Sequence, residues 1–178
     1  MVLKPLDMSP EEAGWQADLL DAIEGEVFRC SRFRRTSTGR VTVNGWCATQ
    51  RLEGAHQEAR WPEIIAVGEA FHDAVRTVPR PSFLDERDNP WSVGDRAAWG
   101  ELGLGALPPV KHLDRLTALL RPLETTSQLI HGDLTGNVLF AEDAPPAVID
   151  LAPYWRPPAF ASAIVVTDAL VWEGADER

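Results

Sequence analysis

Cysteine is scarce in this chain, and the scarcity narrows the class of protein. The two cysteines, Cys30 and Cys47, form no CxxC pair, and neither stands near a histidine at metal-ligand spacing. This excludes a disulfide framework and a zinc site of the usual spacing. We expect two buried, reduced thiols in a cytoplasmic protein, and no secretory signal peptide at the amino end.

Long apolar runs and basic residues are also scarce. The longest apolar run, residues 159–172, is interrupted by Ser162, Thr167 and Asp168, so no segment is expected to span a membrane. The chain has 17 Lys and Arg against 27 Asp and Glu, which gives a net charge of −10. Nucleic acid is therefore not an expected partner, because phosphate backbones are bound by concentrated Lys and Arg. Acidity does not exclude ATP, since a bound metal reverses the local charge.

Two glycine-rich phosphate-binding motifs are absent as well. Neither GxGxxG nor GxxxxGK[ST] occurs in the chain, so no phosphate-cradling loop of these two kinds is predicted. The 178 residues are 44% hydrophobic, which is enough to bury a core as one domain or two small lobes.

The most informative stretch is residues 129–140, LIHGDLTGNVLF, followed by AVIDL at 147–151. Three apolar runs of strand length predict a small buried sheet. The loop between the first two runs presents His131, Asp133 and Asn137, and Asp150 ends the third. Carboxylate and amide oxygens are hard ligands that suit Mg²⁺ better than zinc. The alternative is a chance cluster of turn-forming polar residues.

Other segments predict a mixture of helices and strands. The sequence SPEE at residues 9–12 opens a helix, with Ser9 as the cap and Glu12 completing a capping box. Further helices are predicted from residue 60 to before Pro79, at 95–100, at 110–120 and at 158–172. Strands at 2–6, 27–33 and 41–48, with a turn at 37–40, are expected to form one sheet packed on the first helix. Residues 81–92 are expected to be a solvated loop, and His72 a packing histidine of the second helix.

The order of these features resembles the catalytic region of the protein-kinase-like fold, in its aminoglycoside phosphotransferase branch. That family has His-Gly-Asp-Leu, an asparagine a few residues later, and a strand that ends in a metal-binding aspartate. The resemblance runs from Leu3 to Trp172, and a subset of actinobacterial relatives of the family shares the segments VLKP, GW, HGDLTGNVLF, IDxxPYWRP and DALVW.

The resemblance implies roles for four residues of the central stretch. Asp133 would accept or orient the proton of a substrate hydroxyl, and His131 would brace the loop. Asn137 and Asp150 would hold Mg²⁺ against the phosphates of ATP.

The resemblance also implies roles for residues near the amino end. Lys4 stands where the family has a strand lysine that contacts the nucleotide phosphates; the alternative is a surface lysine. Glu12 is a candidate acid to pair with this lysine, and its capping role is the alternative explanation. The family's usual place for the acid is nearer Gln16.

The fold implied is α+β with two lobes. Residues 1–54 would form a truncated amino-terminal lobe of sheet and helix, and residues 55–178 a mainly helical lobe that carries the catalytic hairpin. Residues 49–54 correspond to the hinge between the lobes. The family's two strands and glycine-rich loop before the strand lysine have no counterpart here. Strand 2–6 would then be an exposed edge through which copies of the chain form a homo-oligomer.

Three functions follow from these observations and stay open. The first is an ATP- and Mg²⁺-dependent phosphotransferase that acts on a hydroxyl of a small molecule. The second is a non-catalytic, pseudokinase-like protein that binds nucleotide. The third is a metal-dependent phosphohydrolase that uses His131, Asp133 and Asp150. The resemblance brings a fold and a site, but no substrate.

Overall fold

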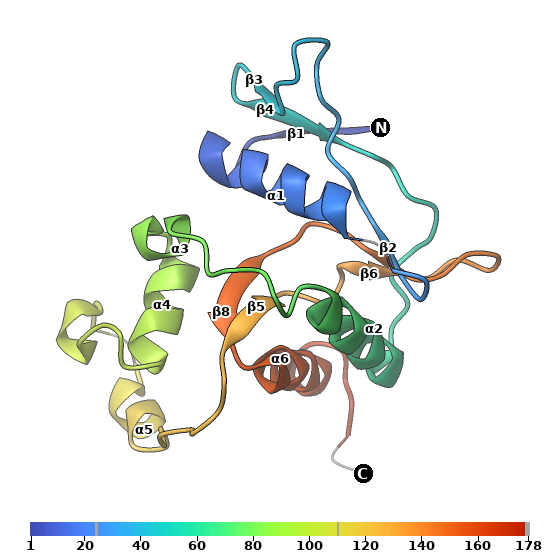
Figure 1. Cartoon of the computed structure of the whole chain (residues 1–178). Helices are drawn as coiled ribbons and strands as arrows, with labels where there is room; N and C mark the ends of the chain where they lie inside the picture. The colour runs from blue at the N-terminus through green and yellow to red at the C-terminus, as the bar shows by residue number, and fades with distance from the viewer. Residues whose placement is uncertain (24, 110, 177–178) are drawn as a thin grey trace. The chain divides into compact units, whose positions relative to one another are not determined.

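The computed structural model describes residues 1–23, 25–109 and 111–176. The chain forms two compact units, one from Met1–Arg80 with Ser127–Arg178 and one from Pro81–Thr126. The predicted mixture of small sheets and helices is confirmed (Figure 1). All site residues predicted from the sequence belong to the first unit. The division into two lobes at residue 54 stays a prediction.

The first sheet is antiparallel and has the strand order β1-β4-β3. Its strands are β1 (Val2–Pro5), β3 (Thr42–Val43) and β4 (Trp46–Thr49). Asn44 and Gly45 join β3 to β4 with φ angles of 49° and 77°, as expected for a two-residue Asn-Gly hairpin. β1 lies at one edge of this sheet, as predicted, and pairing of two copies through that edge stays a prediction.

The run at residues 27–33 is not the third strand of this sheet, and the prediction is wrong in that respect. Its middle forms β2 (Arg29–Cys30), which pairs in parallel with β7 (Ala147–Val148). The run meets the first sheet only at its end, where Phe33 bridges to Thr49. Because β7 is almost wholly buried, pairing with it satisfies the backbone of β2 inside the core. Local periodicity carries no information about such a distant partner.

The predicted hairpin with its turn at residues 142–146 is present. β6 (Val138–Leu139) pairs antiparallel with β7. The prediction that the preceding strand, β5 (Gln128–His131), belongs to the same sheet is wrong. β5 pairs antiparallel with β8 (Pro153–Arg156). The reason is a reversal of the chain at Asp150, which has a left-handed φ of 46°. This reversal brings β8 beside β5.

Helix α1 (Pro10–Ala22) begins as predicted. The Ser9 Oγ atom accepts a hydrogen bond from the Glu12 backbone N–H at 3.0 Å, and Pro10 occupies the first turn, where a missing N–H is tolerated. The buried face of the helix contains two polar side chains, Glu12 and Gln16. Buried polar groups require partners, and the partner of Gln16 lies in the candidate site.

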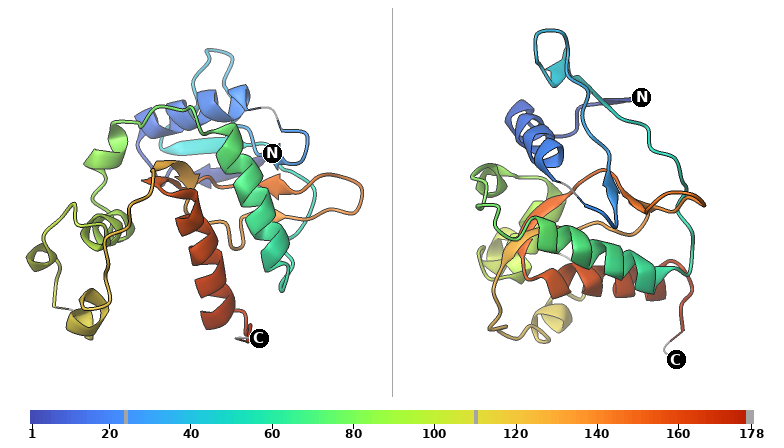
Figure 2. Two further views of the ribbon diagram at one scale, coloured as in Figure 1. Left: turned by 60° about the horizontal axis from the view of Figure 1, so that its bottom comes forward. Right: turned by 45° about the vertical axis from the view of Figure 1, so that its right-hand side comes forward.

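Helices α2 (Trp61–Ala74) and α6 (Pro158–Val171) pack against each other and against β5 (Figure 2). The core lies between these helices, α1 and the hairpin, and its fully buried members include Ala17, Ile64, Phe71, Leu129, Ile130, Val138 and Val165. Among the described residues, no helix is long and apolar enough to cross a bilayer.

Both cysteines are free thiols, and the predicted burial holds for Cys47 but not for Cys30. Cys47 is buried and Cys30 is half-buried, and burial raises the pKa of the Cys30 thiol to about 12. Because the thiolate is the reactive form, neither burial nor ionisation favours reaction at Cys30.

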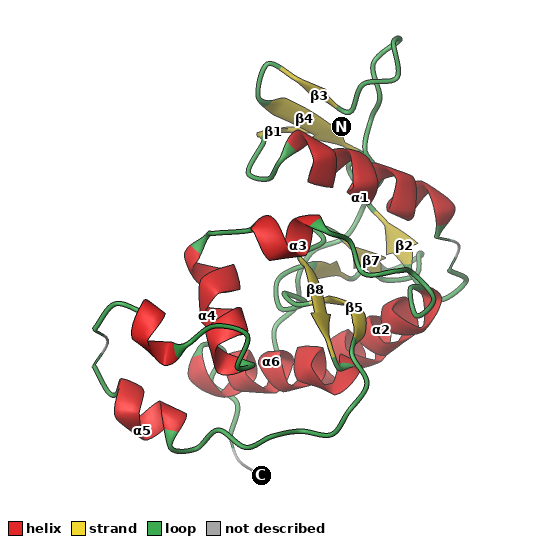
Figure 3. Ribbon diagram, turned by 60° about the vertical axis from the view of Figure 1, so that its left-hand side comes forward, coloured by secondary structure: helices red, strands yellow, loops and turns green. Residues whose placement is uncertain are grey.

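The second unit consists of short helices joined by loops (Figure 3). They are α3 (Phe83–Glu86), α4 (Pro90–Ala98), a 3-10 helix η1 (Leu104–Ala106) and α5 (Leu113–Thr117). The expected solvated loop at 81–92 is therefore wrong. Phe83 and Leu84 are buried, and Asn89 Oδ1 caps α4 by accepting from the Ser92 N–H at 3.0 Å.

The helix predicted at residues 110–120 is shorter in the structure. Val110 lies outside the described residues. His112 has a left-handed φ of 69°, and α5 starts only after it, because a left-handed residue cannot continue a right-handed helix.

Candidate functional site

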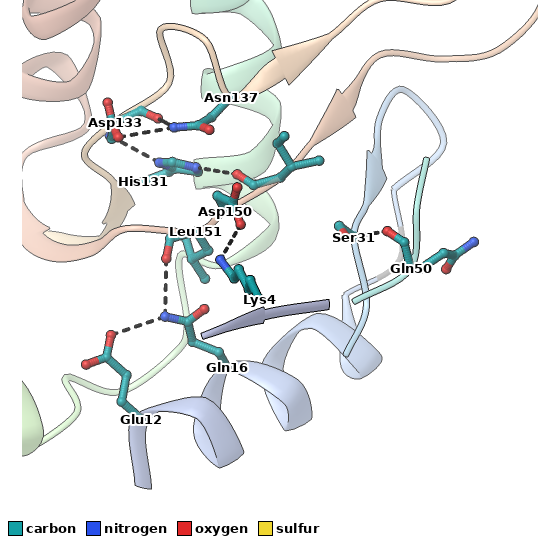
Figure 4. Close-up of polar contacts among 11 residues, drawn as sticks. Lys4, Glu12, Gln16, Ser31, Gln50, His131, Asp133, Asn137, Asp150 and Leu151 are labelled. Carbon is teal, nitrogen blue, oxygen red and sulfur yellow. Dashed lines mark hydrogen bonds and ion pairs between the residues drawn. The ribbon is translucent and has the colours of Figure 1, made fainter. Parts of the chain in front are cut away.

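The loop after β5 is built around His131, which is completely buried. Its Nδ1 atom accepts a hydrogen bond from the Asp133 N–H at 3.1 Å, and its Nε2 atom lies 3.1 Å from the Ile149 carbonyl oxygen (Figure 4). Because Nδ1 accepts, the ring proton lies on Nε2 and is donated to Ile149. His131 thus joins the loop to the end of β7, which is the bracing position predicted for it.

The protonation of His131 follows from the same surroundings. Burial lowers the pKa of His131 from 6.5 to about 4, although the Ile149 carbonyl and the nearby Asp150 charge oppose the shift. The neutral ring is therefore the form present near pH 7. Only this form can accept from Asp133 and donate to Ile149 at once.

A second buried histidine supports the loop from α2. The His72 Nε2 atom accepts a hydrogen bond from the His131 backbone N–H at 3.1 Å, and the His72 carbonyl oxygen accepts from Gln128 Nε2 at 2.7 Å. Burial, followed by the neighbouring His131, lowers the pKa of His72 to about 4. The expected packing histidine is thus also a hydrogen-bond partner of the loop.

Asn137 closes the loop onto Asp133. The Asn137 Nδ2 group donates to the Asp133 carbonyl oxygen at 2.8 Å and to Asp133 Oδ2 at 3.1 Å. Gly136, with a φ of 80°, permits the tight turn between them. With its nitrogen engaged by Asp133, the amide of Asn137 keeps its carbonyl oxygen for another partner.

The Asp133 side chain is the reactive candidate of the loop, and the residue is exposed. Partial desolvation, and then the negative charge of Asp168 on α6, raise the pKa of Asp133, while the hydrogen bond from Asn137 lowers it. Sequence reasoning missed Asp168 as a neighbour of the site. Its only signal is that it is the single charged residue of a mainly apolar helix.

Lys4 and Asp150 form the other half of the site. The Lys4 Nζ atom lies 2.6 Å from Asp150 Oδ1, and the side chains are 25% and 52% exposed. Burial disfavours the ammonium form of Lys4, but the hydrogen bond and the charge of Asp150 outweigh it, so the pKa of Lys4 lies above its usual value. The strand lysine therefore pairs with the predicted metal-binding acid.

Glu12, the predicted acidic partner of Lys4, makes a different contact. One of its carboxylate oxygens accepts from Gln16 Nε2 at 3.1 Å, and the same Gln16 nitrogen donates to the Leu151 carbonyl oxygen at 3.2 Å. The α1 side chain that donates to the segment of Asp150 in this contact is thus the amide of Gln16. A role of Glu12 in holding a nucleotide stays a prediction.

A cleft of about 540 Å³ opens beside the Lys4–Asp150 pair. It is lined by Val2 and Lys4 of β1, by the linker at residues 50–54, and by Leu139, Ile149 and Asp150.

The linker is held in place by β2. Ser31 Oγ donates to the Gln50 carbonyl oxygen at 2.7 Å, and Arg29 Nη2 donates to the Glu53 carbonyl oxygen at 2.8 Å. Between these anchors, and within the part of the chain that is described, the backbone groups of Arg51 and Leu52 make no backbone hydrogen bond. Unpaired backbone groups at the wall of a cleft can receive a ligand.

The donor set fits a magnesium ion. Asn137 offers its side-chain Oδ1 atom and Asp150 a carboxylate. The Ile149 N–H donates to the backbone carbonyl oxygen of Asn137 at 3.0 Å, which keeps the two segments side by side. Mg²⁺ commonly takes one or two protein carboxylates and completes its shell with water and substrate phosphates. Among the described residues, no three His, Cys, Asp or Glu side chains gather as a metal cluster.

A loop acid followed by an asparagine, a strand-end acid and a strand lysine are the working parts of kinase-like phosphotransferases. In this chain the asparagine stands four residues after the acid, against five in the protein-kinase pattern. Residues 2–154 match the family model described as the phosphotransferase enzyme family, APH. Because this match spans most of the chain, the protein belongs to that family.

A solved structure shows the same fold. The crystal structure of spectinomycin phosphotransferase APH(9)-Ia, in complex with ADP and spectinomycin, is similar with a TM-score of 0.55. The two chains are 12% identical over 99% of this chain and 68% of that one, so the likeness is one of fold. No curated protein sequence matches the chain.

Proposed function

We propose that this protein transfers the γ-phosphoryl group of ATP to a hydroxyl of a small molecule. The observation that carries the proposal is that two hydrogen-bonded pairs, Asp133 with Asn137 and Lys4 with Asp150, lie on segments joined by a backbone hydrogen bond at one end of the hairpin. Catalysis in this class is mainly positioning and charge neutralisation, and these side chains supply both. Membership of the phosphotransferase family supports the proposal.

In this proposal Asp133 receives the substrate. Its exposed carboxylate accepts a hydrogen bond from the incoming hydroxyl and holds the proton that the hydroxyl loses. Asn137 fixes the carboxylate by its 3.1 Å hydrogen bond to Oδ2, and His131 fixes the backbone N–H of the same residue at 3.1 Å. The base is thus oriented from two sides before substrate arrives.

Asp150 and Asn137 would hold Mg²⁺, which when bound neutralises the phosphate charge. Lys4 would exchange one partner for another, because its ammonium already lies 2.6 Å from Asp150 and a phosphate oxygen offers the same charge. The nucleotide would occupy the cleft, with its base against Val2 and Leu139 and its edge toward the free backbone groups of Arg51 and Leu52. In this placement the linker at residues 50–54 would be the hinge that contacts the nucleotide base. The proposed boundary between the two lobes would then lie at residue 54.

The test is the affinity for ATP with and without Mg²⁺, measured by isothermal titration calorimetry on the wild type and on Asp150→Asn. We expect Mg²⁺ to strengthen ATP binding by the wild type and not by the variant. Identical, Mg²⁺-independent binding by both proteins would remove the metal assignment. Phosphate transfer to a panel of hydroxyl compounds, followed with γ-labelled ATP, then identifies the substrate class.

A second candidate is nucleotide binding without turnover. It is favoured by the pairing of Lys4 with Asp150 itself and by the lack of both glycine-rich phosphate motifs. If this candidate is correct, Mg²⁺-ATP raises the melting temperature of the protein, and no label passes from γ-labelled ATP to any acceptor, including water. Transfer that is lost in Asp133→Asn would exclude it.

A further inference from the structure

One buried side chain connects α1 to the segment that carries Asp150. Gln16 Nε2 donates to the Leu151 carbonyl oxygen at 3.2 Å and to Glu12 Oε1 at 3.1 Å (Figure 4). Gln16 is 2% exposed and Glu12 is 5% exposed, so both hydrogen bonds form away from water. If the two segments moved apart, a buried donor and a buried acceptor would both lose their partner. The contact therefore resists displacement.

The residue next to this contact has an unusual backbone. Asp150 has a φ of 46°, a left-handed conformation that is uncommon for residues other than glycine and is visited by aspartate as a single residue. The carbonyl groups on both sides of Asp150 are held by buried side chains. His131 donates to the Ile149 carbonyl oxygen at 3.1 Å, and Gln16 donates to that of Leu151. Together they fix the peptide group that precedes Asp150 and the one that follows Leu151, so the backbone is held on both sides of Asp150.

We propose that Gln16 is a positioning residue for Asp150. By holding the Leu151 carbonyl oxygen, it keeps Asp150 in the conformation that presents its carboxylate to Lys4 and to the metal of a bound nucleotide. The role of the metal rests on the proposed function, whereas the effect of Gln16 on the backbone at Asp150 does not.

The chemistry of this contact requires an amide at position 16. A glutamate there would set a carboxylate against two acceptors, the Leu151 carbonyl oxygen and the Glu12 carboxylate, without a donor between them. Gln16 is thus not exchangeable for the acid that has the same shape.

The test compares two variants of the full chain. Gln16→Met keeps a buried side chain of similar length but removes the donor. Leu20→Ala weakens the packing of the same buried helix face at a residue that makes no hydrogen bond to Leu151.

The first measurement is the gain in ATP affinity that Mg²⁺ produces. We expect Gln16→Met to reduce this gain by about tenfold, as for other residues that orient a metal ligand, and Leu20→Ala to keep it. An equal loss of affinity with and without Mg²⁺, or a loss shared by Leu20→Ala, would show that Gln16 acts only through stability and would overturn the proposal.

The second measurement needs no ligand. In ¹⁵N-labelled protein, the amide resonances of Asp150 and Leu151 are expected to shift in Gln16→Met and to stay in place in Leu20→Ala. Unshifted resonances in Gln16→Met would overturn the proposal even if nucleotide binds. A wild type that gains no ATP affinity from Mg²⁺ would instead overturn the proposed function, and the amide resonances would still decide the role of Gln16.

Discussion

The Lys4 Nζ atom lies 2.6 Å from Asp150 Oδ1, so the strand lysine and the strand-end acid neutralise each other at the wall of the cleft. Both side chains are partly exposed, and an ion pair of this kind contributes at most about 1 kcal/mol to stability. The ion pair matters more for the positions that it gives to the two charged groups. In the proposed function, the Lys4 ammonium would contact a nucleotide phosphate in place of Asp150, and the Asp150 carboxylate would bind the metal in place of Lys4.

The first prediction concerns Lys4. In Lys4→Met we expect ATP affinity to fall by about tenfold or more, because a hydrogen bond to a charged group contributes roughly 1.5–3 kcal/mol. The free energy of unfolding should change by less than about 1 kcal/mol. Calorimetric titration with ATP and urea unfolding measure the two effects.

Arg35 provides a matched control for Lys4. Its Nη2 atom lies 2.6 Å from Asp18 Oδ1, so Arg35→Met removes an ion pair of the same length at a residue that does not line the cleft. ATP affinity should be unchanged in this variant. An equal loss in both variants would mean that net charge, rather than the position of Lys4, determines binding.

The second prediction concerns the pH dependence of turnover. Asp133 must be ionised to act as a base, and partial desolvation together with Asp168 raises its pKa. The acid limb of the rate profile should therefore lie above the ordinary range of an aspartate, and Asp168→Asn should move it to lower pH. Asp133→Asn should lower the rate by a factor on the order of 10² to 10⁴ and keep ATP binding. An Asp168→Asn profile that coincides with the wild type would contradict the coupling of the two acids.

The local sequence singles out His131, Asp133, Asn137 and Asp150 as candidate site residues, because these residues lie in one loop and one strand end. It also located the cap of α1 at Ser9, since capping depends on residues only three apart. Both kinds of signal are short-range, and the structure brings the predicted residues together.

The supporting contacts were not predictable in this way. The ring of His72 meets the His131 N–H across 59 positions of the chain, and Gln16 meets Leu151 across 135. Such contacts arise from the packing of helices on strands, and neither hydrophobic periodicity nor motif spacing encodes them. The pairing of β2 with β7 was missed for the same reason, because a strand does not specify its partner by its own pattern.

The third prediction uses the two buried histidines. Each has a pKa of about 4 in the folded protein against 6.5 ordinarily, so the unfolded chain binds more protons between these values. Stability should therefore be full above pH 6.5 and should fall as the pH drops toward 4. The loss is on the order of 3 kcal/mol for one histidine, and the two neighbouring rings titrate as a pair.

His72→Gln tests this assignment. Glutamine keeps an acceptor for the His131 N–H but does not titrate, so the decline in stability toward pH 4 should be shallower than in the wild type. Urea unfolding at a series of pH values between 7 and 4 measures both slopes. Equal slopes would place the acid sensitivity elsewhere in the chain.

The fourth prediction concerns the close packing of α2 against the loop that follows β5, at residues 132–137. A Cβ atom at Gly68 would overlap the Cδ1 atom of Leu134, which is 1% exposed and closely packed. Gly68→Ala should therefore destabilise the protein by about 1–2 kcal/mol, because the overlap outweighs the gain in helix propensity. Gly14 on α1 has no atom near the equivalent position, so Gly14→Ala should stabilise the protein by about 0.5–1 kcal/mol.

A double-mutant cycle separates the overlap from the effect on the helix alone. In a Leu134→Ala background the clash is absent, so Gly68→Ala should become neutral or stabilising there, as Gly14→Ala is in the wild type. Equilibrium unfolding in urea gives the four free energies. If Gly68→Ala lowers the free energy of unfolding equally in both backgrounds, Leu134 does not determine the need for glycine at this position. The loop that follows β5 would then not depend on this contact for its packing against α2.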